Sequence, residues 1–207
     1  MSIEIFDFEQ NSPEWLAARA GIPTASSFAD VLAKGEGKTR AAYRNKLAAE
    51  ILTGEPLESY SNGFMERGHV QEDDARQLYA FMTDADPIRV GFVRNGNKGC
   101  SPDSLIGEKG VLEIKTQRAD LLIETIRKDV FPAVHIAQCQ GALWVTEREW
   151  IDIVCYAPKM PLFVKRAYRD EAYIEALAGA VDLFTQEVAA TVRAIQAYGA
   201  PTQSRAA

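Results

Sequence analysis

Hydrophobic residues recur at three- and four-residue spacings in several parts of the chain, which is the pattern of amphipathic helices. The longest such stripe predicts a helix from about residue 171 to 198 that packs on a core or on another subunit. Its members are Tyr173, Leu177, Val181, Phe184, Val188, Val192 and Ile195. Helix-capping residues and apolar spacing together predict shorter helices over 13–19, 24–33, 39–53, 62–81, 118–127 and 132–144.

Other segments alternate between apolar and polar residues, or are apolar throughout, as strands are. These segments are 87–93, 100–106, 111–116, 150–156 and 162–168. The segment 150–156 is apolar enough for the centre of a sheet, and 162–168 is expected at an edge. Together the elements predict one α/β or α+β domain over residues 1–207, with a mixed sheet covered by helices and a flexible tail over about 199–207.

Three charged side chains, Asp103, Glu113 and Lys115, interrupt the two apolar segments that flank the turn at 107–110. Residues two apart on a strand share a face, so Glu113 and Lys115 point the same way. A hairpin symmetric about residue 108 places Asp103 opposite Glu113, with Cβ atoms about 4.5–5.5 Å apart. Carboxylates that close repel unless a proton or a divalent cation lies between them, which predicts a metal site. An ordinary solvent-facing edge hairpin fits the same spacing.

The helix predicted over 62–81 carries carboxylates beside its apolar face. Glu72 lies at the margin of that face, Asp74 falls inside it and Asp73 lies outside it. A carboxylate at the margin can reach inward to an ion, but the helical position does not choose between Glu72 and Asp74. The face consists of Phe64, Val70, Ala75, Leu78, Tyr79, Phe81 and Met82.

A second kind of site is predicted near Thr24, which can cap the helix over 24–33. Free backbone amides and the hydroxyls of Thr24 and Ser26 at a helix N-terminus favour an anion, and Arg19 lies just upstream. The alternative is a plain capped helix with Arg19 on the surface. A basic cluster follows, and it either contacts phosphates or forms a solvated helix face. Its members are Lys34, Lys38, Arg40, Arg44 and Lys46.

The composition narrows the classes of function. The chain has 207 residues and a formal net charge of −6 at pH 7. That charge argues against a nonspecific nucleic-acid coat protein, but not against a nuclease whose acidic site adds negative charge. We expect no membrane span and a cytoplasmic location, because the sequence has no long apolar run and begins with an acidic segment. Cys100, Cys139 and Cys155 are expected as buried free thiols.

Six short segments resemble, in order, the phage lambda-type 5′→3′ exonucleases, a viral recombinase or alkaline exonuclease family of the PD-(D/E)XK nuclease superfamily. Asp103 followed by Glu113-Ile-Lys115 is similar to the superfamily signature. The resemblance implies a restriction-endonuclease-like core with a mixed central sheet flanked by helices. The matching segments are 15–21, 24–26, 72–76, 100–103, 112–115 and 137–146.

The resemblance implies a role for each residue that matches a family motif. Glu72 is selected over Asp74, and Glu72, Asp103 and Glu113 would hold one or two Mg²⁺ ions together with the carbonyl of Ile114. Hard oxygen ligands suit Mg²⁺, for which Mn²⁺ can substitute. Lys115 would orient or deprotonate the attacking water.

A pocket for a 5′-terminal phosphate is also implied. Arg19, Ser26, Ser101 and Gln138 match this pocket, and the helix N-terminus at Thr24 gives it a physical basis. Arg40 and Arg44 are expected to contact DNA. His135 stands where related enzymes can carry a tyrosine, and its role stays open.

The implied protein is a Mg²⁺-dependent 5′→3′ exonuclease of phage or prophage type that digests one strand of linear double-stranded DNA. The resemblance further implies a homotrimeric ring and a single-strand annealing protein as partner. One alternative is an endonuclease or repair nuclease of the same superfamily. Another is a catalytically silent DNA-binding module, against which the intact set of three carboxylates and a lysine argues.

Overall fold

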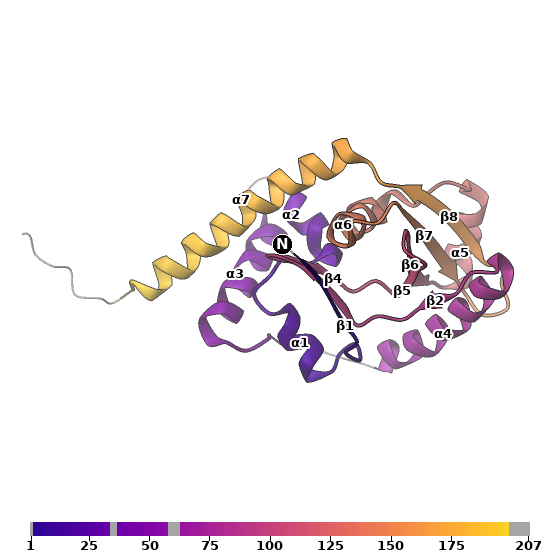
Figure 1. Cartoon of the computed structure of the whole chain (residues 1–207), viewed down its shortest axis with the longest axis horizontal. Coiled ribbons are helices and arrows are strands. Elements are labelled where there is room, and N and C mark those ends of the chain that lie inside the picture. Colours follow the sequence, from indigo (N-terminus) through magenta and orange to yellow (C-terminus); the bar gives the residue numbers. More distant parts are fainter. Residues whose placement is uncertain (1, 34–36, 58–62, 199–207) are drawn as a thin grey trace, which may run out of the picture.

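The computed structural model describes residues 2–33, 37–57 and 63–198, with side chains of the helix that begins at 63 described from residue 71 onward. The predicted helices are present with ends within three residues of the expected ones, except that 24–33 and 132–144 are each divided into a short 3-10 turn followed by an α-helix (Figure 1). The helices are α1 (Pro13–Arg19), η1 (Ala25–Ser27), α2 (Phe28–Leu32), α3 (Lys38–Thr53), α4 (Gly63–Thr83), α5 (Ala119–Lys128), η2 (Ala133–His135), α6 (Ile136–Thr146) and α7 (Glu171–Gln196). The predicted tail over 199–207 lies outside the described residues.

The strands form two sheets. A small antiparallel sheet has the order β1-β3-β4, and a larger one has the order β2-β5-β6-β7-β8. In the larger sheet β6 and β7 run parallel while the other neighbours are antiparallel, which confirms the predicted mixed sheet. The strands are β1 (Ile3–Phe6), β2 (Pro87–Ile88), β3 (Phe92–Asn95), β4 (Lys98–Cys100), β5 (Ser104–Ile106), β6 (Gly110–Thr116), β7 (Trp150–Tyr156) and β8 (Phe163–Tyr168).

Two segments predicted as single strands are each divided between the two sheets. The segment 87–93 breaks at Gly91, whose amide donates to the carbonyl of Phe6 at 2.9 Å. A Cβ at this glycine would lie 2.0 Å from the carbonyl oxygen of Phe8, so only glycine permits the close approach. The segment 100–106 breaks at Pro102, which has no amide to continue a ladder. The pattern of apolar and polar residues did not predict β1, which pairs with β3.

The hairpin register is the predicted one. Ser104 pairs with Leu112, Leu105 with Val111 and Ile106 with Gly110, so the pairing is symmetric about residue 108. Asp103 immediately precedes β5, and the same register continued by one residue places it opposite Glu113. The predicted interior position of β7 is confirmed, because it pairs with β6 on one side and β8 on the other, and the predicted edge position of β8 is confirmed as well.

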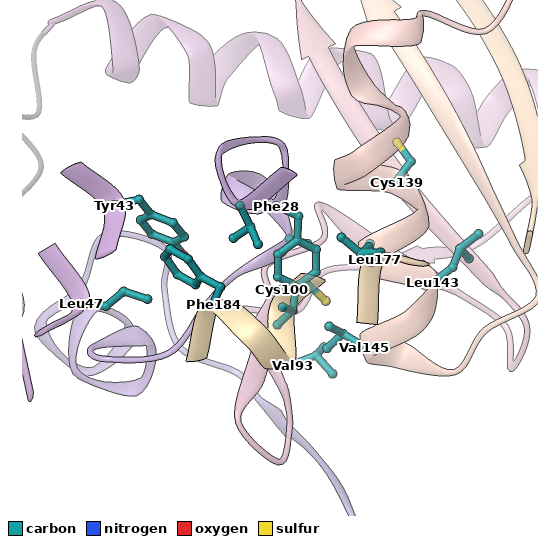
Figure 2. Packing of buried hydrophobic residues seen from close by; sticks show 14 of the residues in the cluster. Phe28, Tyr43, Leu47, Val93, Cys100, Cys139, Leu143, Val145, Leu177 and Phe184 are labelled. Carbon is teal, nitrogen blue, oxygen red and sulfur yellow. The ribbon is translucent and has the colours of Figure 1, made fainter. Parts of the chain in front are cut away.

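The core has a large part on the α6 side of the sheet and a smaller part on the α4 side. Helix α6 packs against both sheets and is buried on nearly every side, as a helix that is apolar all round must be. Figure 2 shows Leu143 of α6 in one cluster with Phe28 of α2 and Leu177 of α7, and Tyr43 of α3 stacked on Phe184 of α7. The smaller cluster joins Ala75 and Tyr79 of α4 to Leu112, Ile114 and Val154.

Some predicted helix faces are wrong at their ends. Phe81 and Met82 are 87% and 57% exposed, so the buried face of α4 is narrower than the periodicity indicated. Phe64 and Val70 lie outside the described side chains. Ile195 of α7 is exposed, whereas the rest of its stripe is buried or half-buried. Within the described residues, no helix is both long and apolar enough to cross a membrane. All three cysteines are free and buried, as expected.

Two helical glycines allow a matched test of the packing. A Cβ at Gly141 in α6 would lie 2.3 Å from the ring of Phe28, whereas a Cβ at Gly179 in α7 would meet nothing within 4 Å. We expect Gly141→Ala to lower the free energy of unfolding by about 1–3 kcal/mol through overpacking. Gly179→Ala should raise it by about 0.5–1 kcal/mol. Denaturant unfolding measures both, and equal effects would contradict the packing of α6 against α2.

Candidate functional site

Side chains from several parts of the chain meet around one cavity of about 400 Å³. They come from α1, η1, α4, the segment between β4 and β5, β6 and α6. The expected site residues that line the cavity are Arg19, Ser26, Glu72, Ser101, Asp103, Glu113, Ile114, Lys115 and Gln138. The fold therefore brings both predicted sites, the carboxylate cluster and the anion pocket, into a single space.

Glu113 and Lys115 share one face of β6, as the strand parity predicts, and form an ion pair. The Nζ atom of Lys115 lies 2.8 Å from Oε1 of Glu113. Gln138 of α6 donates from Nε2 to the same oxygen at 2.5 Å. The side chain of Glu113 is only 5% exposed, so the two donors compensate the cost of burying its charge.

Asp103 lies beside this pair and accepts a hydrogen bond on Oδ2 from the backbone amide of Ile114 at 2.6 Å. Burial, followed by the repulsion of Glu113 and then of Glu72, raises the pKa of Asp103 well above its usual value. The Ile114 amide and Lys115 act in the opposite direction without cancelling this effect. Three carboxylates from three parts of the chain thus line one cavity, and a bound cation would relieve their repulsion.

Lys115 is held as an ammonium ion in this arrangement. Burial lowers its pKa, but the charge and hydrogen bond of Glu113, together with Asp103, outweigh burial and raise the pKa above the ordinary value. His135 behaves differently, because burial and the positive charge of Lys115 lower its pKa to about 4. His135 is therefore neutral near pH 7, and it does not add positive charge to the site.

The lining of the same cavity also carries a cation. Arg19 donates from Nη1 to the hydroxyl of Ser101 at 2.9 Å. Its guanidinium lies 3.9 Å from the ring centroid of Trp15, whose indole Nε1 also donates to the Ser101 hydroxyl, at 3.1 Å. Burial lowers the pKa of Arg19, but an arginine stays charged at any physiological pH. A fixed guanidinium beside a hydroxyl is suited to an anionic group such as phosphate.

The expected anion site at a helix N-terminus is corrected by the structure. The segment 24–33 forms the three-residue turn η1 followed by the five-residue α2 instead of one helix, so its dipole is small. The amide of Thr24 is not free, because it donates to the hydroxyl of Tyr43 at 3.0 Å. Thr24 is buried and lines a separate small cavity behind Arg19, whereas Ser26 faces the main one.

Comparison with known proteins identifies the family. The sequence matches the YqaJ-like viral recombinase domain over residues 14–149. The chain belongs to this family. A search of curated protein sequences gave no match.

Solved structures agree with membership of the YqaJ-like family. The alkaline exonuclease LHK-Exo from Laribacter hongkongensis is 32% identical and superposes with a TM-score of 0.80 over 89% of this chain and 96% of that one. The structure of LHK-Exo in complex with dAMP is 33% identical and superposes with a TM-score of 0.82, again over 89% of this chain and 96% of that one. A phage-related exonuclease from Haemophilus somnus shares the fold. It is 14% identical and superposes with a TM-score of 0.64 over 84% of this chain and 96% of that one. These relatives support a nuclease that acts on DNA.

The YqaJ-like chain offers the ligands that a hard cation prefers, namely buried carboxylates and a backbone carbonyl. In the described part of the chain, however, no three His, Cys, Asp or Glu side chains are grouped so as to hold a metal ion. Glu113 is paired with Lys115 and Gln138 instead, and Asp103 with the Ile114 amide. The donor chemistry of these carboxylates and of the backbone carbonyl fits Mg²⁺.

Arg40 and Arg44 do not line the cavity. Arg40 forms an ion pair with Glu187 of α7 at 2.8 Å and is 14% exposed, so it holds α3 against α7. Arg44 is half-buried, and its Nε atom meets no hydrogen-bond partner in the described chain. Lys46 pairs with Glu50 at 3.8 Å, and Lys34 lies outside the described residues. Arg40 and Lys46 are thus engaged in ion pairs, and contact of this cluster with phosphates stays a prediction.

Trp15 and Arg76 touch the site, yet the motifs did not assign them a role. Trp15 lies four residues before Arg19 in α1, so the i,i+4 rule predicts contact between the two. Arg76 lies four residues after Glu72 in α4, and the same rule places it on the same helix face. Neither spacing indicates the partner, because Ser101 and Ser104 are distant in the sequence.

Proposed function

We propose that the chain is a Mg²⁺-dependent 5′→3′ exonuclease that digests one strand of linear double-stranded DNA from a 5′-phosphorylated end. It would leave a 3′ single strand for recombination by strand annealing. One observation supports the proposal most. Ser101, which contacts the cationic end of the cavity, is only two residues from Asp103 in the carboxylate cluster. The segment 101–103 would thus hold a terminal phosphate and the bond to be cut at neighbouring positions.

The residues of the cluster would divide the work of hydrolysis. Glu72, Asp103 and Glu113 would hold Mg²⁺ together with the Ile114 carbonyl. Mg²⁺, when bound, supplies Lewis-acid stabilisation of developing negative charge. Lys115 would orient or deprotonate the attacking water, because its Nζ atom lies 2.8 Å from Oε1 of Glu113 and therefore next to the proposed metal ligands.

The residues around Arg19 in the same cavity would select a DNA terminus that carries a phosphate. Arg19 and Ser101 offer a charged fork and a hydroxyl to a terminal phosphate, and Ser26 faces the same space. Gln138 donates to Glu113 and would connect the phosphate pocket to the cluster. An enzyme that grips the new 5′-phosphate after each cut can advance along one strand. A closed circle offers no such phosphate.

The proposed assembly is a homotrimeric ring that works with a single-strand annealing protein. A ring would explain how a chain with a net charge of −6 retains DNA, since three copies pool their phosphate contacts. Because Arg40 is engaged by Glu187, those contacts would come from other residues.

Digestion of three substrates tests the function. The protein would be incubated with Mg²⁺ and duplex DNA that is linear with 5′-phosphates, linear with 5′-hydroxyls, or closed circular. We expect fast digestion of the first, slower digestion of the second and none of the third. Cutting of the circle would support the alternative endonuclease. An inert protein would support the alternative DNA-binding module.

A further inference from the structure

Helix α4 presents polar side chains to the sheet at Glu72, Arg76 and Tyr79, spaced four and three residues apart. The side chain of Arg76 is 11% exposed, and Tyr79 is 1% exposed. Tyr79 donates its hydroxyl to Asp152 at 2.6 Å, which joins α4 to β7. The helix that carries Glu72 is therefore fixed to the sheet by polar contacts as well as by apolar packing.

Arg76 reaches the segment that carries Asp103. Its Nε atom donates to the hydroxyl of Ser104 at 2.9 Å, and its Nη2 atom approaches the backbone carbonyl of Asp103 at 3.4 Å. Ser104 is fully buried and donates to the same carbonyl at 2.5 Å. One guanidinium thus holds the residue at which β5 begins, one helical turn from Glu72.

The remaining edge of the guanidinium is held as well. Arg76 donates from Nη1 to Asp73 on its own helix, and Asp73 also accepts from Arg89, which follows β2. Because the fork is occupied on both sides, it has one orientation, unlike a lysine on a flexible stem.

We propose that Arg76 is a positioning residue that sets the Glu72 and Asp103 carboxylates at the spacing a divalent cation requires. The inference rests on the proposed function, since it takes these carboxylates as metal ligands. It also predicts the direction in which metal affinity changes when Arg76 is replaced. A positive charge near the carboxylates repels a metal ion, so removing the charge alone would strengthen metal binding. Removing a positioning residue would weaken it, by about 10–100-fold where outer contacts orient metal ligands.

Calorimetric titration of Mn²⁺ into the DNA-free protein tests this inference. We expect Arg76→Met to bind Mn²⁺ about 10–100-fold more weakly than the wild type. Arg76→Lys keeps the charge but loses the fork, and it should also bind more weakly. Tyr79→Phe is the matched control, because it removes the other polar anchor of α4. It should lower Tm and leave Mn²⁺ affinity unchanged.

Each other outcome overturns the proposal. Equal or tighter Mn²⁺ binding by Arg76→Met would show that Arg76 only adds charge or stability. Equal weakening in Tyr79→Phe would show that any loosening of α4 has the same effect. If Arg76→Met does not fold, Ser104→Ala decides, since it removes the acceptor without changing charge, and unchanged affinity would contradict the proposal. If the wild type neither binds Mn²⁺ nor cleaves DNA, both the proposed function and the inference are wrong. If the wild type does both, the Arg76 variants test the inference alone.

Discussion

Lys115→Ala and Asp103→Ala should each lower the rate of DNA cleavage by at least about 10²–10³-fold, the usual effect of removing one group that stabilises transition-state charge. Lys115 is the ammonium group that β6 places beside Glu113, and Asp103 is the carboxylate whose pKa burial and the neighbouring Glu113 and Glu72 raise. Initial rates on a linear 5′-phosphorylated duplex with Mg²⁺ measure the loss. A variant with near wild-type rates would remove that residue from the site.

Lys109→Ala is the matched control for Lys115→Ala. Lys109 lies in the turn of the same hairpin, and its ion pair with Glu149 joins two side chains that are 64% and 59% exposed. Such a pair contributes little to stability, and the turn lies away from the cavity lining. We therefore expect Lys109→Ala to cleave DNA at the wild-type rate. A comparable loss in this control would point to damage of the hairpin instead of loss of chemistry.

Asp103→Asn separates loss of activity from loss of fold. Because the folded chain raises the pKa of Asp103, it favours the protonated form. The stability from that proton is present at low pH and is lost as the pH rises through the raised pKa. Asparagine cannot ionise and keeps an acceptor for the Ile114 amide. In EDTA near pH 7 this inactive variant should therefore have a higher Tm than the wild type, and a large fall in Tm would contradict the crowding of carboxylates.

Arg19→Ala should chiefly erase the preference for a 5′-phosphate. A hydrogen bond to a charged group contributes about 1.5–3 kcal/mol, which corresponds to about 10–100-fold in rate on the phosphorylated duplex. The rate on a 5′-hydroxyl duplex should change far less, because that substrate offers no terminal charge. The ratio of the two rates measures the effect, and an unchanged ratio would remove Arg19 from the pocket.

Arg19→Lys and Trp15→Phe refine the same measurement. Lysine keeps the charge but loses the fork and the stacking on Trp15, so it should keep only part of the preference. Phenylalanine keeps a ring beneath Arg19 but loses the indole N–H that donates to Ser101. Trp15→Phe should therefore weaken the preference without reversing it. A full loss in Trp15→Phe alone would show that Ser101, and not the cation, recognises the phosphate.

Local rules predicted the parts of the site that lie on one hairpin. Strand parity placed Glu113 and Lys115 on one face, and turn symmetry placed Asp103 near Glu113. Both rules depend only on residues within a dozen positions of one another. The choice of Glu72 over Asp74 needed the family resemblance, because a helical wheel gives the face of a helix but not what it packs against.

Local rules did not predict features that depend on contacts between distant segments of the chain. The strand breaks at Gly91 and Pro102 depend on β1 and on the change of sheet, which no local pattern indicates. The Thr24 amide was expected to be free, but Tyr43 reaches it from α3. Phe81 continues the apolar spacing of α4 beyond the part of the helix that the sheet covers, and it is exposed. In each case a partner far away in the sequence determines the outcome.

The direction of digestion tests the central claim most directly. A linear duplex would carry one 5′-phosphorylated strand, with the other 5′ end blocked, and would be labelled on the phosphorylated strand at either its 5′ or its 3′ end. With Mg²⁺, we expect the 5′ label to appear at once as a 5′-mononucleotide. The 3′ label should stay on long fragments until the end of the reaction, and the blocked strand should remain intact. Early release of the 3′ label, or release of internal fragments, would contradict a site that grips a 5′-phosphate beside its cutting centre.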